Sequence, residues 1–106
     1  RRYTFDALIN QWLPGKYDPA DFSLKLAHKD VGLATALGRE LGLPMRICDL
    51  AHAEMTEAMS RGWAQRDSRV VMVLEQERAG IDVKVDPTRL KEALAMPFPA
   101  TQAAKK

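Results

Sequence analysis

The segment FSLKLAHKDVGLATALGRELGLP, residues 22–44, carries apolar side chains at the spacing of an amphipathic helix. At 100° per residue, Phe22, Leu33 and Leu37 all fall within about 40° of Leu26. This periodicity predicts a long helix with a single apolar stripe, and a globular protein ordinarily turns such a stripe toward its core.

Two charged residues, Lys29 and Asp30, interrupt this stripe. They lie about 60° to one side of Leu26 and about 40° to the other. In the simplest interpretation, the lysine stem rests on apolar surface while its ammonium group reaches water. Alternatively, the helix borders a cleft, where Lys29 would donate to a carboxylate, phosphate or amide oxygen. This second interpretation requires an anionic or polar partner, because an unpaired buried ammonium is too costly.

Turn and capping residues divide the chain into four or five helices. Pro14 and Gly15 end the first helix, and Gly42 ends the second. The run VVMVL has the composition of a buried strand, but its flanking residues favour a helix closed by Gly80. The first predicted helix spans residues 3–12, and the second runs from a cap at Asp21 or Ser23 to about Leu41. The third has Pro44 in its first turn and ends at Gly62. The fourth runs from a cap at Asp67 or Ser68 to Gly80, and the fifth from the Asp86 cap through Pro87 to residue 96.

The fold class expected from these segments is all-α, an orthogonal bundle of four to five helices joined by short loops. Residues 1–106 are predicted to form a single helical domain or part-domain, with the core in 20–95 and 96–106 frayed. The third helix should pack through one stripe, formed by Ile47, Cys48, Ala51, Met55, Ala58 and Met59.

Composition excludes several classes of protein. Sixteen basic and fourteen acidic residues give the 106-residue chain a net charge of only +2, with the two signs interspersed. No nucleic-acid partner is therefore expected. The longest apolar run is far too short to cross a bilayer, so no membrane partner is expected either. With one cysteine, Cys48, and no secretory leader in the sequence, we predict a soluble, cytoplasmic protein.

The sequence contains no self-sufficient catalytic or metal-binding motif. Its six glycines form neither G-x-G-x-x-G nor a phosphate-binding loop. His28 and His52 lack further ligands at metal-binding spacing, and Cys48 on an apolar stripe is expected to be structural. We therefore assign no catalytic residue and no metal site. Because the chain opens RRYTFD without methionine, we expect a fragment of a longer polypeptide or a processed one.

Residues 21–76 resemble the C-terminal helical domain of the β-hydroxyacid dehydrogenases, the family of 3-hydroxyisobutyrate dehydrogenase and tartronate semialdehyde reductase. The shared features are Phe22 seven residues before the KD pair of Lys29 and Asp30, followed by VGLA and ELGLP. A helix ending in Gly62 and the aspartate of QRDSRVV complete the resemblance. It covers roughly residues 20–78, and one departure is Ala36, where the family often has an acidic residue.

The resemblance implies a helical domain like the C-terminal domain of 6-phosphogluconate dehydrogenase, closing over a Rossmann domain that binds NAD or NADP. Lys29 and Phe22 would then be cofactor-binding residues, and Asp30 would fix the lysine or the helix packing. Nothing here matches the family's catalytic lysine or its Rossmann fingerprint. The chain would therefore be inactive alone. Its partners would be a Rossmann domain of the same polypeptide, a small hydroxy-acid substrate and further copies of itself in a homo-oligomer.

Two other functions compete with this interpretation. A small helical interaction module, associating through Met- and Val-rich faces, would equally leave apolar surface exposed on the isolated chain. A helix-turn-helix DNA-binding protein is disfavoured by the balance of charge.

Overall fold

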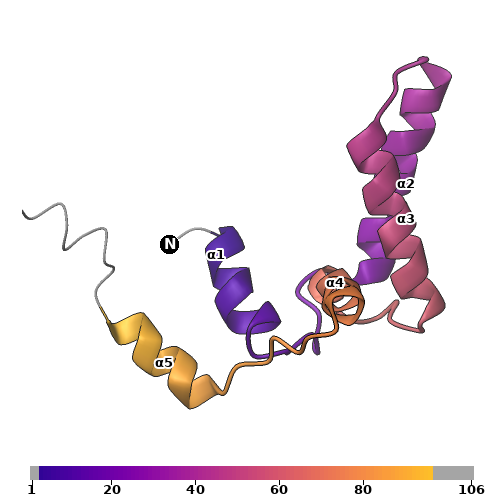
Figure 1. The fold of residues 1–106 in the computed structure, drawn as a ribbon. Helices are drawn as coiled ribbons and strands as arrows, with labels where there is room; N and C mark the ends of the chain where they lie inside the picture. Colours follow the sequence, from indigo (N-terminus) through magenta and orange to yellow (C-terminus); the bar gives the residue numbers. More distant parts are fainter. Residues whose placement is uncertain (1–2, 97–106) are drawn as a thin grey trace, which may run out of the picture. The chain divides into compact units, whose positions relative to one another are not determined.

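The computed structural model describes residues 3–96, and every regular element within that range is helical (Figure 1). The predicted all-α fold is therefore confirmed for this part of the chain. Within the described residues, the helices belong to two compact units, one formed by residues 3–15 with 83–96 and the other by residues 16–82. The predicted frayed segment lies, apart from Met96, outside the described residues.

The first unit combines the predicted N-terminal and C-terminal helices. Helix α1 (Tyr3–Ala7) runs directly into a π-helical turn, η1 (Leu8–Trp12). The N–H of Leu13 donates to the Leu8 carbonyl at 3.0 Å, the i to i−5 bond that defines such a turn. Helix α5 (Pro87–Ala95) begins as predicted, with the Asp86 side chain accepting from the N–H of Thr88.

In the second unit, α2 (Leu24–Glu40) and α3 (Arg46–Ser60) form an antiparallel hairpin (Figure 1). Ser23 caps α2 as predicted, because its hydroxyl accepts from the N–H of Leu26 at 3.3 Å. Gly42, with φ of +67°, ends the helix in a conformation that glycine adopts without strain. The prediction that Pro44 lies in the first turn of α3 is wrong, since the loop continues to Met45.

The predicted fourth helix consists of two pieces. Asp67 caps a 3₁₀ turn, η2 (Ser68–Val71), which leads into α4 (Met72–Ala79) and ends at Gly80. The VVMVL run is therefore helical rather than a strand. The core of this unit takes one or two buried residues from each element: Leu24, Ala27, Ala58, Val70 and Leu74.

The predicted stripe on α3 is correct except at its first position. Ala58 is buried, and four other members of the stripe are partly buried: Cys48, Ala51, Met55 and Met59. Ile47, in contrast, is 86% exposed, because it lies in the first turn of α3, beside the loop where α2 has ended.

Candidate functional site

Helix α2 packs through a face made largely of small residues. Its buried positions are Leu24, Ala27, Thr35 and Gly38. A methyl group added at Gly32 would lie 3.0 Å from Nε2 of His52, and one added at Gly38 would lie 2.5 Å from Sδ of Met45. These two positions without a Cβ atom let the backbone of α2 approach α3 and its leading loop closely.

Apart from the buried Leu24, the large apolar side chains of α2 lie on the opposite face and are exposed. Leu33 is 64% exposed, Leu37 is 54% exposed, and Phe22, just before the helix, is 39% exposed. The expectation that this stripe faces the core of the chain is therefore wrong. The small-residue face, roughly opposite on the helix, allows the closer approach to α3 and is buried instead.

Lys29 and Asp30 are both exposed and lie beside this leucine stripe. Within residues 3–96 neither side chain takes part in an ion pair, so Asp30 does not hold Lys29 in place. The Lys29 ammonium group is thus a cation next to apolar surface. This arrangement is compatible with both interpretations of Lys29: its ammonium group reaches water, and it is also accessible to a ligand that could supply the partner.

A buried carboxylate organises the entry into α2. Asp67 is fully buried, and its Oδ2 accepts from the backbone N–H groups of Asp21 at 3.0 Å and Phe22 at 3.3 Å. Its Oδ1 accepts from the N–H of Arg69 at 2.9 Å and lies 3.4 Å from the Arg69 guanidinium. The N–H of Ser68 donates to the Phe22 carbonyl at 2.8 Å, so the two segments are bonded in both directions.

The loop before η2 also satisfies the first turn of α2. The N–H of Leu24 donates to the Arg66 carbonyl at 2.8 Å, and the N–H of Lys25 donates to the Ala64 carbonyl at 2.9 Å. The N–H of Leu26 donates to the Ser23 hydroxyl, so groups of the chain itself satisfy the first three N–H groups of α2. This helix end therefore has no open donors for binding an anion.

An arginine and two aromatic rings pack beside this loop. The Arg66 guanidinium lies 5.5 Å from the Tyr17 ring centroid and 5.9 Å from that of Trp63, and it pairs with Asp18 at 3.2 Å. Burial raises the pKa of the Tyr17 phenol above its ordinary value, although the Arg66 charge opposes this. The Tyr17 carbonyl accepts from the N–H of Asp67 at 2.9 Å, which connects this cluster to the buried carboxylate.

Two histidines stack at the border between α2 and α3. The ring centroids of His28 and His52 are 4.4 Å apart with an interplanar angle of 20°. Thr56 donates its hydroxyl to the His52 carbonyl at 2.8 Å and so is left to accept from Nε2 of His28, also at 2.8 Å. Partial burial, and then the charge of His52, lowers the pKa of His28 below its ordinary value.

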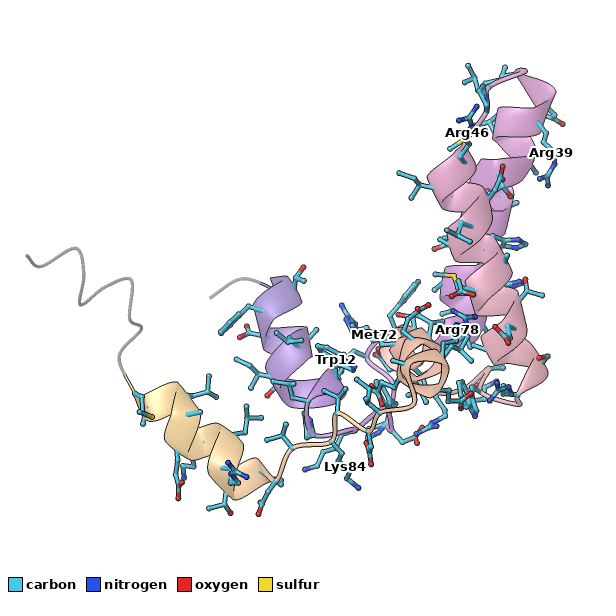
Figure 2. All side chains as sticks on the ribbon, in the orientation of Figure 1. Trp12, Arg39, Arg46, Met72, Arg78 and Lys84 are labelled. Atoms are coloured by element: carbon cyan, nitrogen blue, oxygen red, sulfur yellow. The ribbon has the colours of Figure 1, made fainter. Side chains whose placement is uncertain are left out.

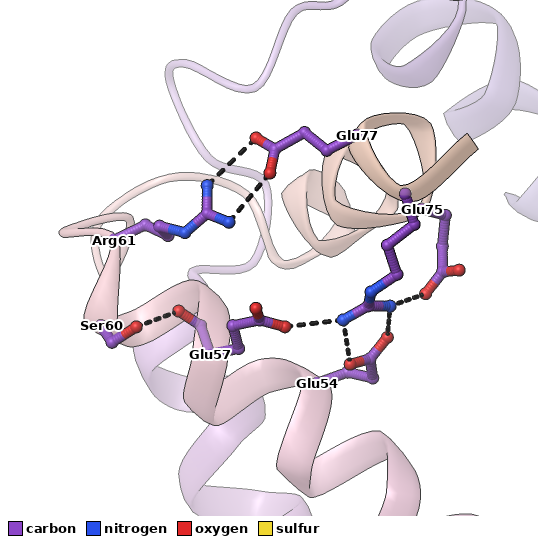
Figure 3. A network of polar contacts seen from close by, with 7 residues as sticks. Glu54, Glu57, Ser60, Arg61, Glu75 and Glu77 are labelled. Atoms are coloured by element: carbon purple, nitrogen blue, oxygen red, sulfur yellow. Dashed lines mark hydrogen bonds and ion pairs between the residues drawn. The ribbon is translucent and has the colours of Figure 1, made fainter. Parts of the chain in front are cut away.

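An exposed network of charges joins α3 to α4 (Figure 3). Arg78 donates to Glu54, to Glu57 at 2.6 Å and to Glu75 at 2.6 Å. The hydrogen bonds from Arg78 are the main reason that the pKa of Glu54 falls to about 2. Every carboxylate around Arg78 is engaged by it, so the network explains these glutamates as structural and leaves none as a general base.

The loop end of the hairpin exposes a second group of large apolar residues. Arg39 and Arg46 lie at this end (Figure 2), and Arg39 Nη1 is 3.9 Å from Asp49 Oδ1. The exposed apolar residues here are Leu41, Leu43, Ile47 and Leu50. Apolar surface on this chain thus extends from the stripe of α2 to the tip of the hairpin.

Between residues 3 and 96, no three histidine, cysteine or acidic side chains come together in a way that could hold a metal ion. In the same range, no helix has the length and apolar character needed to cross a bilayer.

Comparison with known families identifies the chain. The model of one family, described as NAD-binding of NADP-dependent 3-hydroxyisobutyrate dehydrogenase, matches residues 2–74. The chain belongs to this family. The family consists of NAD(P)-dependent dehydrogenases, and the match includes Phe22, Lys29 and Asp67. No individual curated protein matches the chain.

Proposed function

We propose that this chain is the C-terminal helical portion of an NAD(P)-dependent oxidoreductase that acts on a 3-hydroxy acid or its semialdehyde. It would supply part of the cleft wall, one cofactor contact and a subunit interface. The cofactor would be bound mainly by a Rossmann domain of the same polypeptide, and the chain by itself would be inactive.

The observation that carries this proposal is the position of Lys29 beside an exposed apolar stripe, without an ion-pair partner among residues 3–96. A dinucleotide offers phosphate and amide oxygens together with flat apolar rings. An exposed ammonium next to leucines and a partly exposed phenylalanine fits those groups. The residues present are therefore compatible with the cofactor that the family binds.

In the proposed enzyme this chain's residues bind and orient rather than react. Lys29 would donate to an oxygen of the cofactor, and apolar neighbours would strengthen that bond by excluding water. Phe22 would place its ring against the cofactor, and the leucine stripe would keep water from the cleft. The bound nicotinamide would supply the chemistry, exchange of a hydride with the hydroxyl-bearing carbon of the substrate.

Replacing Lys29 tests this proposal in the full-length polypeptide. Lys29→Ala should raise the Kd for NADH or NADPH about tenfold, because a charge-assisted hydrogen bond is lost. Lys91→Ala, the same change at an exposed lysine of α5, serves as the control. Unchanged Kd and kinetics in Lys29→Ala, with folding intact, would contradict the assignment of this residue.

A helical interaction module remains the second candidate, and the exposed apolar tip of the hairpin favours it. If association is the only function, Ile47→Asp should abolish oligomer formation in sedimentation experiments. Titration with NADH and NADPH would then show no binding to the full-length polypeptide.

A further inference from the structure

Asp67 is the one fully buried carboxylate among the described residues, and it lies between two segments that are distant in sequence. It caps η2, a role that needs only one of its oxygens. The other oxygen accepts from Asp21 and Phe22, which lie 46 and 45 residues earlier in the chain. The second oxygen therefore has a function that capping does not explain.

The geometry of the carboxylate couples these two segments rigidly. Its two oxygens are fixed in one plane, Oδ1 on the Arg69 N–H at 2.9 Å and Oδ2 on the Asp21 N–H at 3.0 Å. Backbone bonds on either side reinforce this link: the N–H of Ser68 donates to the Phe22 carbonyl, and the N–H of Leu24 donates to the Arg66 carbonyl, both at 2.8 Å. The position of Phe22 is thus determined by the start of η2.

Phe22 is also the first residue of the exposed stripe that carries Lys29. Its backbone is held from the buried side, while the residue as a whole remains 39% exposed. We propose that Asp67 is a positioning residue, which acts through the backbone of Phe22 to hold this ring against a bound dinucleotide. This inference rests on the proposed function and adds to it a residue that does not touch the cofactor.

Asp67→Asn in the full-length polypeptide tests the inference. An asparagine must turn its amide nitrogen either toward the N–H groups of Asp21 and Phe22 or toward that of Arg69, so the link loses one end. We expect the Kd for NADPH and NADH to rise about tenfold, as for the loss of a hydrogen bond to a charged group. The matched control is Asp86→Asn, because Asp86 caps α5 in the same way but lies in the other unit. It should leave both Kd values unchanged.

A double-mutant cycle separates positioning from general destabilisation. In a Phe22→Ala background, Asp67→Asn should change the Kd less than about twofold, because the ring that it positions is gone. An undiminished effect in that background would overturn the inference, as would equal effects of Asp67→Asn and Asp86→Asn. If Asp67→Asn does not fold, Arg69→Ala weakens the same carboxylate from the Oδ1 side and should act through Phe22 in the same cycle.

Lys29→Ala distinguishes failure of this inference from failure of the proposed function. If Lys29→Ala weakens dinucleotide binding while Asp67→Asn does not, Asp67 is a structural cap only and the proposed function stands. If the full-length polypeptide binds neither NADH nor NADPH, the proposed function fails and this inference fails with it.

Discussion

The two faces of α2 differ in size and chemistry, and the face with the larger apolar side chains is the exposed one. Glycine, alanine and threonine carry much of the buried face, whereas leucines carry the exposed face together with Lys29. Hydrophobic burial depends on how closely two helices can approach as well as on how apolar a side chain is. The exposed apolar stripe of α2, opposite its buried small-residue face, is therefore a surface that is available for a second partner.

Leucine-to-alanine substitutions on the two faces give the largest expected difference. Leu24→Ala removes a fully buried side chain and should lower the free energy of unfolding by about 2–5 kcal/mol. Leu33→Ala, on the exposed face of the same helix, should change it by no more than about 0.5 kcal/mol. Urea unfolding of the chain measures both, and equal losses would show that the leucine stripe is packed after all.

Added volume at the small-residue face should have an intermediate effect. Gly38→Val places atoms against Met45 and close to the Leu43 carbonyl, so we expect destabilisation of about 1–3 kcal/mol. Ala36→Val, at an exposed position of α2, is the control and should cost only the helix propensity of valine, about 0.5 kcal/mol. Similar values for the two variants would mean that α2 and α3 do not need this close approach.

The histidine pair at the edge of the buried face should give a smaller, pH-dependent effect. Because the pKa of His28 is lowered in the folded chain, the unfolded chain binds more protons as the pH falls through about 6.5. The contribution of His28 to stability is therefore complete above that pH and is lost on acidification. His28→Gln should reduce the fall in stability between pH 7 and pH 5, as measured by thermal unfolding. An unchanged or steeper fall would contradict this role.

Much of the local structure follows from the sequence because caps and glycines act over a few residues. Ser23, Asp67 and Asp86 all cap as predicted, and Gly42, Gly62 and Gly80 all have positive φ angles at or just after helix ends. Such signals are local, so no knowledge of the tertiary fold is needed to use them.

The contacts between elements could not be predicted from the sequence in the same way. Periodicity places Leu26 and Leu33 on one stripe but does not say whether another part of the chain covers it. Similarly, the cap at Asp67 can be predicted, whereas its bonds to Asp21 and Phe22 depend on how segments 45 residues apart come together. The stacking of His28 on His52 depends on the register of α2 against α3, which neither helix fixes by itself.

The central claim is that the exposed stripe of α2 contacts a bound dinucleotide through Lys29. Amine-reactive labelling of the full-length polypeptide, followed by mass spectrometry, tests it directly by comparing Lys29 with Lys91 in the presence and absence of NADPH or NADH. We predict that one of the dinucleotides slows labelling of Lys29 several-fold and leaves Lys91 unchanged. Identical labelling of Lys29 with and without saturating dinucleotide would contradict the claim.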